Sequence, residues 1–169
     1  MVLKLALAGA IALAYRSRTS APGGGVPPFI GASAEALARE LKPAPIQPAW
    51  ILDGTPQARV VSHSTTADKC SATAIWDCTA GTFRWFFGDD ETVVILDGEV
   101  SITAEDGTQR LLRAGDIGYF KAGTWATWRI DRYVRKIAFM RQPIWMPLAL
   151  VYRVRNRVRR ALKGGGLGL

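Results

Sequence analysis

Hydrophobic and polar positions alternate in short segments through most of the chain. These segments are rich in β-branched and aromatic residues, a composition typical of β-strands. Glycine and aspartate separate them, and the pairs Asp97–Gly98 and Asp106–Gly107 are typical of hairpin turns. The pattern predicts strands over residues 58–64, 70–78, 82–87, 91–96, 99–105, 108–114, 117–120, 126–130 and 133–140. Evenly spaced strands without helices between them indicate an all-β sandwich or barrel.

The segment before these strands combines a short helix with a proline-rich arm. Ser33 is a good N-cap and precedes strong helix formers, so a helix is predicted over residues 33–41. Residues 42–50 contain three prolines, which rule out both a helix and a central strand. We expect this stretch to run as an extended arm over the surface of the domain.

Residues 143–169 predict a basic amphipathic helix followed by a Gly-rich tail. Pro147 can begin this helix and Gly164 can end it. Arginines fill many positions between apolar residues that recur at helical spacing, namely Leu148, Val151, Val154, Val158 and Ala161 or Leu162. Residues 144–163 are suited to bind an anionic membrane surface or to pack on the barrel or a dimer partner. Nucleic acid is a weaker hypothesis, since no base-reading motif is present and only sequence-blind binding is expected.

The net positive charge of the chain comes from its two ends. The formal net charge is +8, but residues 1–25 and 141–169 contain only basic charged residues. The segment between them carries slightly more acidic than basic side chains. The basic composition therefore gives no indication of what the central part of the chain binds.

The first residues raise the question of targeting. The apolar run over residues 5–15 is about half as long as a bilayer-spanning helix. A secretory signal, an organelle presequence and a weakly helical extension are all compatible with it, but Arg16 and Arg18 directly after the run oppose export. We therefore expect a cytoplasmic chain or one peripheral at a membrane surface.

The sequence divides into three regions: an extension and Gly/Pro linker over 1–28, a domain over 29–142, and the tail over 143–169.

Two motif fragments give the central domain a family resemblance. Glu91 is followed after six residues by Gly98, and Gly115 and Gly123 are set in the segment RAGDIGYFKAGTWATW. With IWDCTAGTFRW and VRKIAF, these segments resemble the cupin superfamily, in particular the small cupins related to the ureidoglycine aminohydrolase domain. The resemblance covers residues 75–140 most densely. It implies a single jelly-roll barrel, that is, a double-stranded β-helix, and a homodimer.

The chain departs from the cupin motifs where a metal would be held. The two histidine positions of the first motif fall on Trp85 and Phe87, or on Arg84 and Phe86 with a longer spacing. In the second motif Lys121 stands at the proline position and Ala126 at the histidine position. Glu91 alone remains of the usual three histidines and one glutamate. Aromatic rings do not ligate a divalent ion, so we predict no metal cofactor.

The same positions predict an aromatic barrel lining. Phe83, Trp85 and Phe87 share one face of a strand. By the resemblance, this face and Trp128 line the barrel, with Lys121 as a further candidate on a loop. Aromatic rings suit sugars, heterocycles or cations. A ligand-holding cup and a packed core remain equal alternatives.

Glu91 is the candidate acid, base or hydrogen-bond acceptor of this lining. Two other roles stay open for it, a surface position or an ion pair with a nearby base such as Lys136. The functional hypothesis is a cupin-fold protein that binds a small polar organic molecule without a tightly bound metal. The alternative is an aminohydrolase-like enzyme acting on a small nitrogen compound or sugar derivative through Glu91. The residues do not decide between a binding protein and an enzyme.

Overall fold

The computed structural model describes residues 27–143, 150, 151, 153–155, 157 and 158. Predictions for the N-terminal extension, and for much of the C-terminal segment, concern residues outside these ranges. All statements below refer to the described residues.

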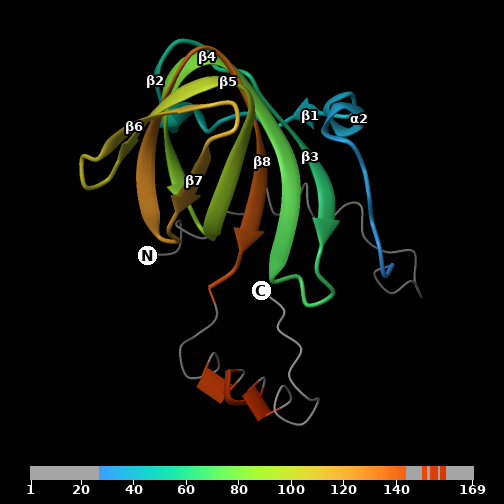
Figure 1. The fold of residues 1–169 in the computed structure, drawn as a ribbon. Coiled ribbons are helices and arrows are strands. Elements are labelled where there is room, and N and C mark those ends of the chain that lie inside the picture. Colours follow the sequence, from blue (N-terminus) through green and yellow to red (C-terminus); the bar gives the residue numbers. More distant parts are fainter. Residues whose placement is uncertain (1–26, 144–149, 152, 156, 159–169) are drawn as a thin grey trace.

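The chain forms one antiparallel sheet that curls into a jelly-roll barrel with an open edge (Figure 1). The strand order is β1-β3-β4-β8-β5-β6, with β2 paired to β4 and β7 paired to β5. The strands are β1 (Lys42–Pro43), β2 (Ile51–Asp53), β3 (Ala58–Thr65), β4 (Ser71–Phe87), β5 (Asp90–Ala104), β6 (Gln109–Arg113), β7 (Ile117–Phe120) and β8 (Thr124–Arg141). The predicted all-β jelly roll is confirmed.

Three strands are longer than the sequence pattern predicts. The strands β4, β5 and β8 each join two predicted strands into one. They continue through the expected breaks on β-bulges, at Gly81 in β4 and around Gly98 in β5. A bulge bends a strand without ending its pairing. The hairpin predicted at Asp97–Gly98 is therefore wrong, whereas Asp106–Gly107 does join β5 to β6.

At Gly98 the backbone of β5 comes very close to the backbone of the neighbouring strand β8. Its φ of +72° is in the left-handed region that glycine adopts without strain. A β-carbon at this position would overlap the backbone carbonyl oxygen of Tyr133 in β8. Two independent constraints, the backbone angle and the space, thus require glycine here.

The N-terminal arm contributes more to the barrel than the sequence predicts. Helix α2 (Ala34–Ala38) is capped as expected, with the Ala36 N–H donating to Ser33 Oγ at 3.1 Å. After β1, Ile46 enters the hydrophobic core, and the 3-10 turn η1 (Pro48–Trp50) follows. Trp50 then packs edge-on against Trp85 and Trp125, at centroid distances of 5.8 and 5.2 Å. The arm is therefore not confined to the surface, because two of its apolar side chains are packed against the barrel.

Aromatic rings fill much of the barrel interior. Phe83 of β4 stacks on Trp128 of β8 with ring centroids 6.3 Å apart, and Phe87 stacks on Phe120 of β7 at 4.2 Å. Aliphatic residues of β5 and β8 surround these rings, including Val93, Ile95, Val100, Ile130 and Val134. This packing occupies the deep part of the barrel.

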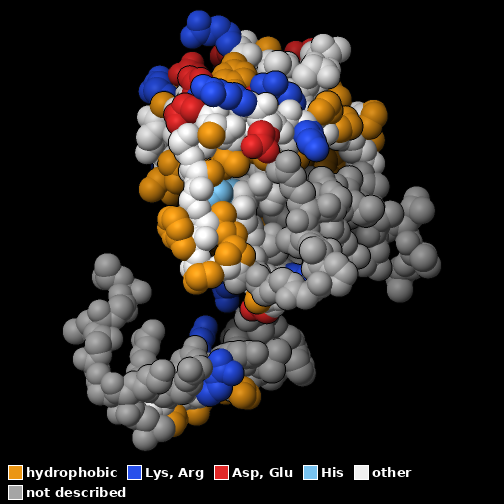
Figure 2. Space-filling model, turned by 90° about the vertical axis from the view of Figure 1, so that its right-hand side faces the viewer, with side chains coloured by type: hydrophobic (Ala, Val, Ile, Leu, Met, Phe, Trp, Pro, Cys, Tyr) orange, Lys and Arg blue, Asp and Glu red, His pale blue; other side chains and the backbone are white. Residues whose placement is uncertain are grey.

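The outer face of the sheet carries an aliphatic row across five strands. The cross-strand register places Val61, Ile75, Ile137, Val94 and Ile117 side by side in that order. Phe139 and Tyr119 follow on the same face, and both are exposed. Outer faces of antiparallel sheets are usually polar, so this row is an unusual feature. From another side of the molecule, Figure 2 shows charged side chains gathered at one end of the barrel, with hydrophobic and uncharged ones below them.

The described residues of the C-terminal segment are helical. Val151, Val154 and Val158 recur on one side of this helix, and each is more than half exposed. The ends of the predicted helix lie outside the described residues. No helix in the described part of the chain has the length and hydrophobicity needed to cross a membrane.

Candidate functional site

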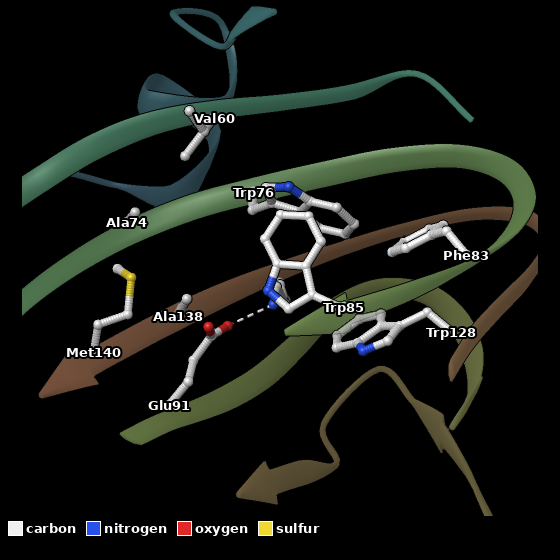
Figure 3. Close-up of a pocket in the computed structure, with 10 residues that line it drawn as sticks. Val60, Ala74, Trp76, Phe83, Trp85, Glu91, Trp128, Ala138 and Met140 are labelled. Atoms are coloured by element: carbon white, nitrogen blue, oxygen red, sulfur yellow. Dashed lines mark hydrogen bonds and ion pairs between the residues drawn. The ribbon is translucent and has the colours of Figure 1, made fainter. Parts of the chain in front are cut away.

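A pocket opens in the barrel beside the aromatic core, between β3, β4, β5 and β8 (Figure 3). Alternation along each strand turns its lining side chains inward. In Figure 3 the carboxylate of Glu91 points toward the indole rings of Trp76 and Trp85, with Trp128 beyond them. The lining consists of Val60, Ala74, Trp76, Phe83, Trp85, Glu91, Trp128, Lys136, Ala138 and Met140.

A buried ion pair forms the polar centre of this pocket. Lys136 Nζ donates a hydrogen bond to Glu91 Oε1 at 2.6 Å. Glu91 is 8% exposed and Lys136 is 5% exposed, so both charges are withdrawn from bulk water. Of the roles left open for Glu91, the structure shows the pair with Lys136. Two withdrawn charges need this contact, because either one alone would be costly to bury.

Two indole rings also surround the ammonium group. Lys136 Nζ lies 4.5 Å from the ring centroid of Trp128 and 5.0 Å from that of Trp76. Cations are attracted to the faces of such rings, most strongly where water is excluded. The combination of a carboxylate and two indoles is a cage for an ammonium ion, and the chain supplies that ammonium itself.

Two residues of the pocket lining carry donors that lack acceptors. The indole N–H groups of Trp76 and Trp128 are buried and have no hydrogen-bond partner among the described residues. Buried donors without partners are rare in proteins and each one costs free energy. An acceptor brought by a bound molecule or by water would relieve this cost.

The free volume of the pocket is about 30 Å³. This is room for about two water molecules. The barrel is thus mostly filled by aromatic rings, with a small cavity at the ion pair. Trp85 and Met140 are only partly buried, so a larger guest would require these two side chains to move.

The predicted lining residues divide into three groups. Phe83, Trp85 and Trp128 line the pocket together with Glu91. Phe87 faces the interior but is buried deeper, against Phe120. Lys121 is exposed in the loop before β8 and does not line the pocket, so its prediction as a barrel-lining residue is wrong. The loop turns it outward, and its carbonyl accepts a hydrogen bond from the Thr124 hydroxyl.

Trp76 was not among the predicted lining residues, and Lys136 was named only as a possible partner of Glu91. Trp76 and Lys136 are paired across β4 and β8, which places them side by side on the inner face. Alternation gave a usable signal for both, since Ala74, Trp76 and Cys78 share one strand face. On β8, Lys136 lies likewise between Val134 and Ala138, whose side chains both face inward. A charged residue at an inward-facing position of an apolar strand indicates a buried ion pair or a functional group.

The donor set does not match the metal centre of the cupin motif. Trp85 and Ala126 stand opposite each other in the β4–β8 register, where the motif has two of its histidines, and Glu91 is already paired with an ammonium. His63 bonds Ser64 through Nδ1 and does not line the pocket. Within the described ranges, no group of three or more histidine, cysteine or acidic side chains is placed to hold an ion. These residues do not fit a divalent metal.

Two further carboxylates stand next to Glu91 in the chain. Asp89 has a raised pKa, because burial disfavours its charge and Glu91 and Asp90 repel it. The pKa of Asp90 is lowered, chiefly because the Ala122 N–H donates to its carboxylate. Asp90 also accepts from the Tyr119 hydroxyl at 3.0 Å. Asp90 therefore anchors the loop before β8, and neither residue lines the pocket.

The fold, together with Glu91 at its motif position on the barrel wall, defines a small cupin domain. The family model of the EutQ-like cupin domain matches residues 65–138. The chain thus belongs to the cupin superfamily and carries a domain of this EutQ-like family.

The chain is also similar to several solved structures. A DUF861 family protein from Thermotoga maritima is 34% identical, with 38% of this chain and 73% of that one covered and a TM-score of 0.37. A DUF861 family protein of unknown function from Pseudomonas syringae is 22% identical, with 59% of this chain and 43% of that one covered and a TM-score of 0.55. The Clostridium difficile EutQ protein is 17% identical, with 54% and 66% covered and a TM-score of 0.46. No curated protein matches the sequence.

Proposed function

We propose that the chain binds a small polar organic molecule in the pocket at Glu91 and Lys136, without a tightly bound divalent metal. The observation that carries this proposal is the buried ion pair of these residues, which borders a cavity walled by three tryptophans. An ion pair retained where apolar side chains would pack at least as well indicates a role beyond stability. Binding sites typically combine apolar walls with a few placed polar groups.

The pocket favours ligands that carry hydrogen-bond acceptors. Its polar groups are the ammonium of Lys136 and the carboxylate of Glu91, and the lining residues Trp76 and Trp128 have indole N–H groups without acceptors among the described residues. Short carboxylates, amides and carbonyl compounds have the matching acceptors. Their apolar parts would lie against the indole faces.

The ammonium of Lys136 also supports the metal-free part of the proposal. It lies within hydrogen-bond distance of the only motif carboxylate, and it would repel a divalent ion brought to the same place. The chain thereby provides its own cation beside Glu91.

The aminohydrolase-like alternative is not favoured by any particular observation. Glu91 is engaged by Lys136, and apart from this pair no described side chain of the pocket lining is an acid–base group. The resemblance to ureidoglycine aminohydrolases, the homodimer, and the membrane-surface role of residues 144–163 remain predictions. So does a location in the cytoplasm or at a membrane surface.

A fragment screen by ligand-observed NMR tests the proposal, using short carboxylates, amides and carbonyl compounds in buffer with a chelator. We expect millimolar or tighter binders, whose affinity falls about fivefold in Trp85→Ala, because a partly buried indole contributes about 1 kcal/mol of contact. Trp85 is the suitable position, since it lines the pocket and is only partly buried.

Trp125→Ala is the matched control. Trp125 also contacts Trp50, but it lies outside the pocket lining, against Phe86. The affinity of each binder should be unchanged in this variant. The absence of binders, equal losses in both variants, or binding abolished by the chelator would each contradict the proposal.

A further inference from the structure

We propose that Lys136 captures small aldehydes covalently, as a protonated imine on its Nζ atom. This inference rests on the proposed function, because it requires that the pocket admit a small molecule. It adds the ligand class, short aliphatic aldehydes, and the atom that binds them. Lysine amines form imines with such carbonyl compounds, and at Lys136 the adjacent Glu91 carboxylate first takes the ammonium proton.

The position of Lys136 distinguishes it from the other described lysines. Lys42, Lys69 and Lys121 are exposed, whereas Lys136 is buried with its Nζ on the pocket. Among the described residues, Glu91 Oε1 accepts the hydrogen bond of its ammonium group. The side chains beside it, among them Ala74, Ala138 and Met140, are apolar and limit the water that would hydrolyse an imine.

Glu91 is placed to move the protons of the reaction. Its Oε1 accepts a proton from the ammonium 2.6 Å away, which leaves a neutral amine with a free electron pair. The amine attacks the aldehyde carbon, and a proton passes from nitrogen to the former carbonyl oxygen. The glutamic acid then returns its proton to that hydroxyl, and the C–O bond breaks. One water leaves, and a protonated imine and the Glu91 carboxylate remain.

The product keeps the electrostatic arrangement of the resting site. A protonated imine has the same single positive charge as the ammonium it replaces. It therefore stays paired with Glu91 and remains near the rings of Trp76 and Trp128, which lie 5.0 and 4.5 Å from Nζ. The site that stabilises the lysine ammonium thus also stabilises the captured aldehyde.

The cavity limits the size of the aldehyde. Its free volume of about 30 Å³ accommodates a chain of a few atoms before Trp85 or Met140 must move. Branched and aromatic aldehydes would overlap the packed rings. Short, unbranched aldehydes are thus the expected class.

Reductive trapping tests this inference. The native chain is incubated with propanal and sodium cyanoborohydride, and the propyl groups on each lysine are then located by peptide mass spectrometry. We expect Lys136 to be labelled before the exposed Lys121, although simple accessibility predicts the reverse order. In urea this preference should disappear, because the unfolded chain has no pocket. This comparison uses the unaltered protein and does not depend on a variant folding.

A variant and a second ligand distinguish failure of the imine proposal from failure of the proposed ligand site. Lys136→Arg, which retains the charge but has no reactive amine, should lose the pocket label and keep the label on Lys121. Propanamide, which is similar in size but forms no imine, reports non-covalent binding through tryptophan fluorescence. Preferential labelling of Lys121 in the native chain, with propanamide bound, would overturn the imine alone. The same labelling without propanamide binding would overturn the proposed ligand site as well.

Discussion

Replacing Lys136 by methionine is expected to lower the free energy of unfolding by about 3 to 5 kcal/mol, as for other buried ion pairs that lose one partner. Methionine is an unbranched apolar side chain one heavy atom shorter than lysine, and it can pack against Trp76 and Trp128. The loss therefore comes from Glu91, which would keep a buried carboxylate without its ammonium. Urea unfolding followed by circular dichroism gives the measurement.

The double variant Glu91→Leu/Lys136→Met should recover most of this loss. With both charges gone, the site becomes an apolar core of similar volume, and such replacements are often neutral or stabilising. A recovery of several kcal/mol in the double-mutant cycle would establish the pair as one coupled unit. Independent, additive losses from the two substitutions would contradict the ion-pair account.

An exposed ion pair provides the control for this cycle. Arg113 Nε lies 3.2 Å from Glu99 Oε2 on the barrel surface, and both side chains are largely exposed. Arg113→Met should cost no more than about 1 kcal/mol, since water screens surface pairs. A comparable loss at both sites would mean that burial is not the cause of the effect at Lys136.

Substituting Gly98 by alanine is expected to destabilise the fold by roughly 3 kcal/mol or more, because two penalties add. The residue has a φ of +72°, which disfavours a side chain. The new methyl group would also overlap the carbonyl oxygen of Tyr133, where β5 crosses β8. Either the strands separate or the bulge rearranges, and both disturb the wall that carries Glu91.

Gly107→Ala carries only the first of these penalties, so its comparison with Gly98→Ala isolates the second. Gly107 has a φ of +85°, but no atom lies within 4 Å of its added β-carbon. Its substitution should therefore cost only about 1 kcal/mol, the backbone term alone. Urea unfolding of both variants gives the comparison, and equal losses would show that the approach of Tyr133 to Gly98 is unimportant.

The sequence pattern predicted the fold class well, because strand alternation is a local property. The strands near residues 58–64, 108–114 and 117–120 were placed within one or two residues. The pattern failed where strands continue through glycine. Gly81 and Gly98 look like turn residues locally, but tertiary pairing with β8 turns them into bulges within long strands.

The candidate site was predicted in part. Glu91 was found through the motif, and Phe83, Trp85 and Trp128 were found through alternation and the motif. The partner role of Lys136 was one of several alternatives, because charge and distance along the chain cannot choose a partner for Glu91. The register of β8 between β4 and β5 makes that choice by placing Lys136 opposite Trp76.

The arm residues depend on contacts that no local pattern contains. Trp50 reaches the pocket wall only because the 3-10 turn at Pro48 directs the chain back to Trp85. The sequence left a ligand-holding cup and a packed core as equal alternatives, and the barrel combines the two. Its deep part is filled by Phe83, Phe87 and Trp128, and a small cavity remains at the ion pair.

The central claim is that the ammonium of Lys136 stands beside Glu91 in place of a metal ion. Elemental mass spectrometry of the full chain, purified with added zinc, manganese, nickel and iron and then desalted, tests it most directly. Glu91→Gln is measured in parallel. The account predicts far less than one metal ion per chain in both proteins. Near-stoichiometric metal in the unaltered chain that disappears in Glu91→Gln would contradict the account and identify Glu91 as a metal ligand.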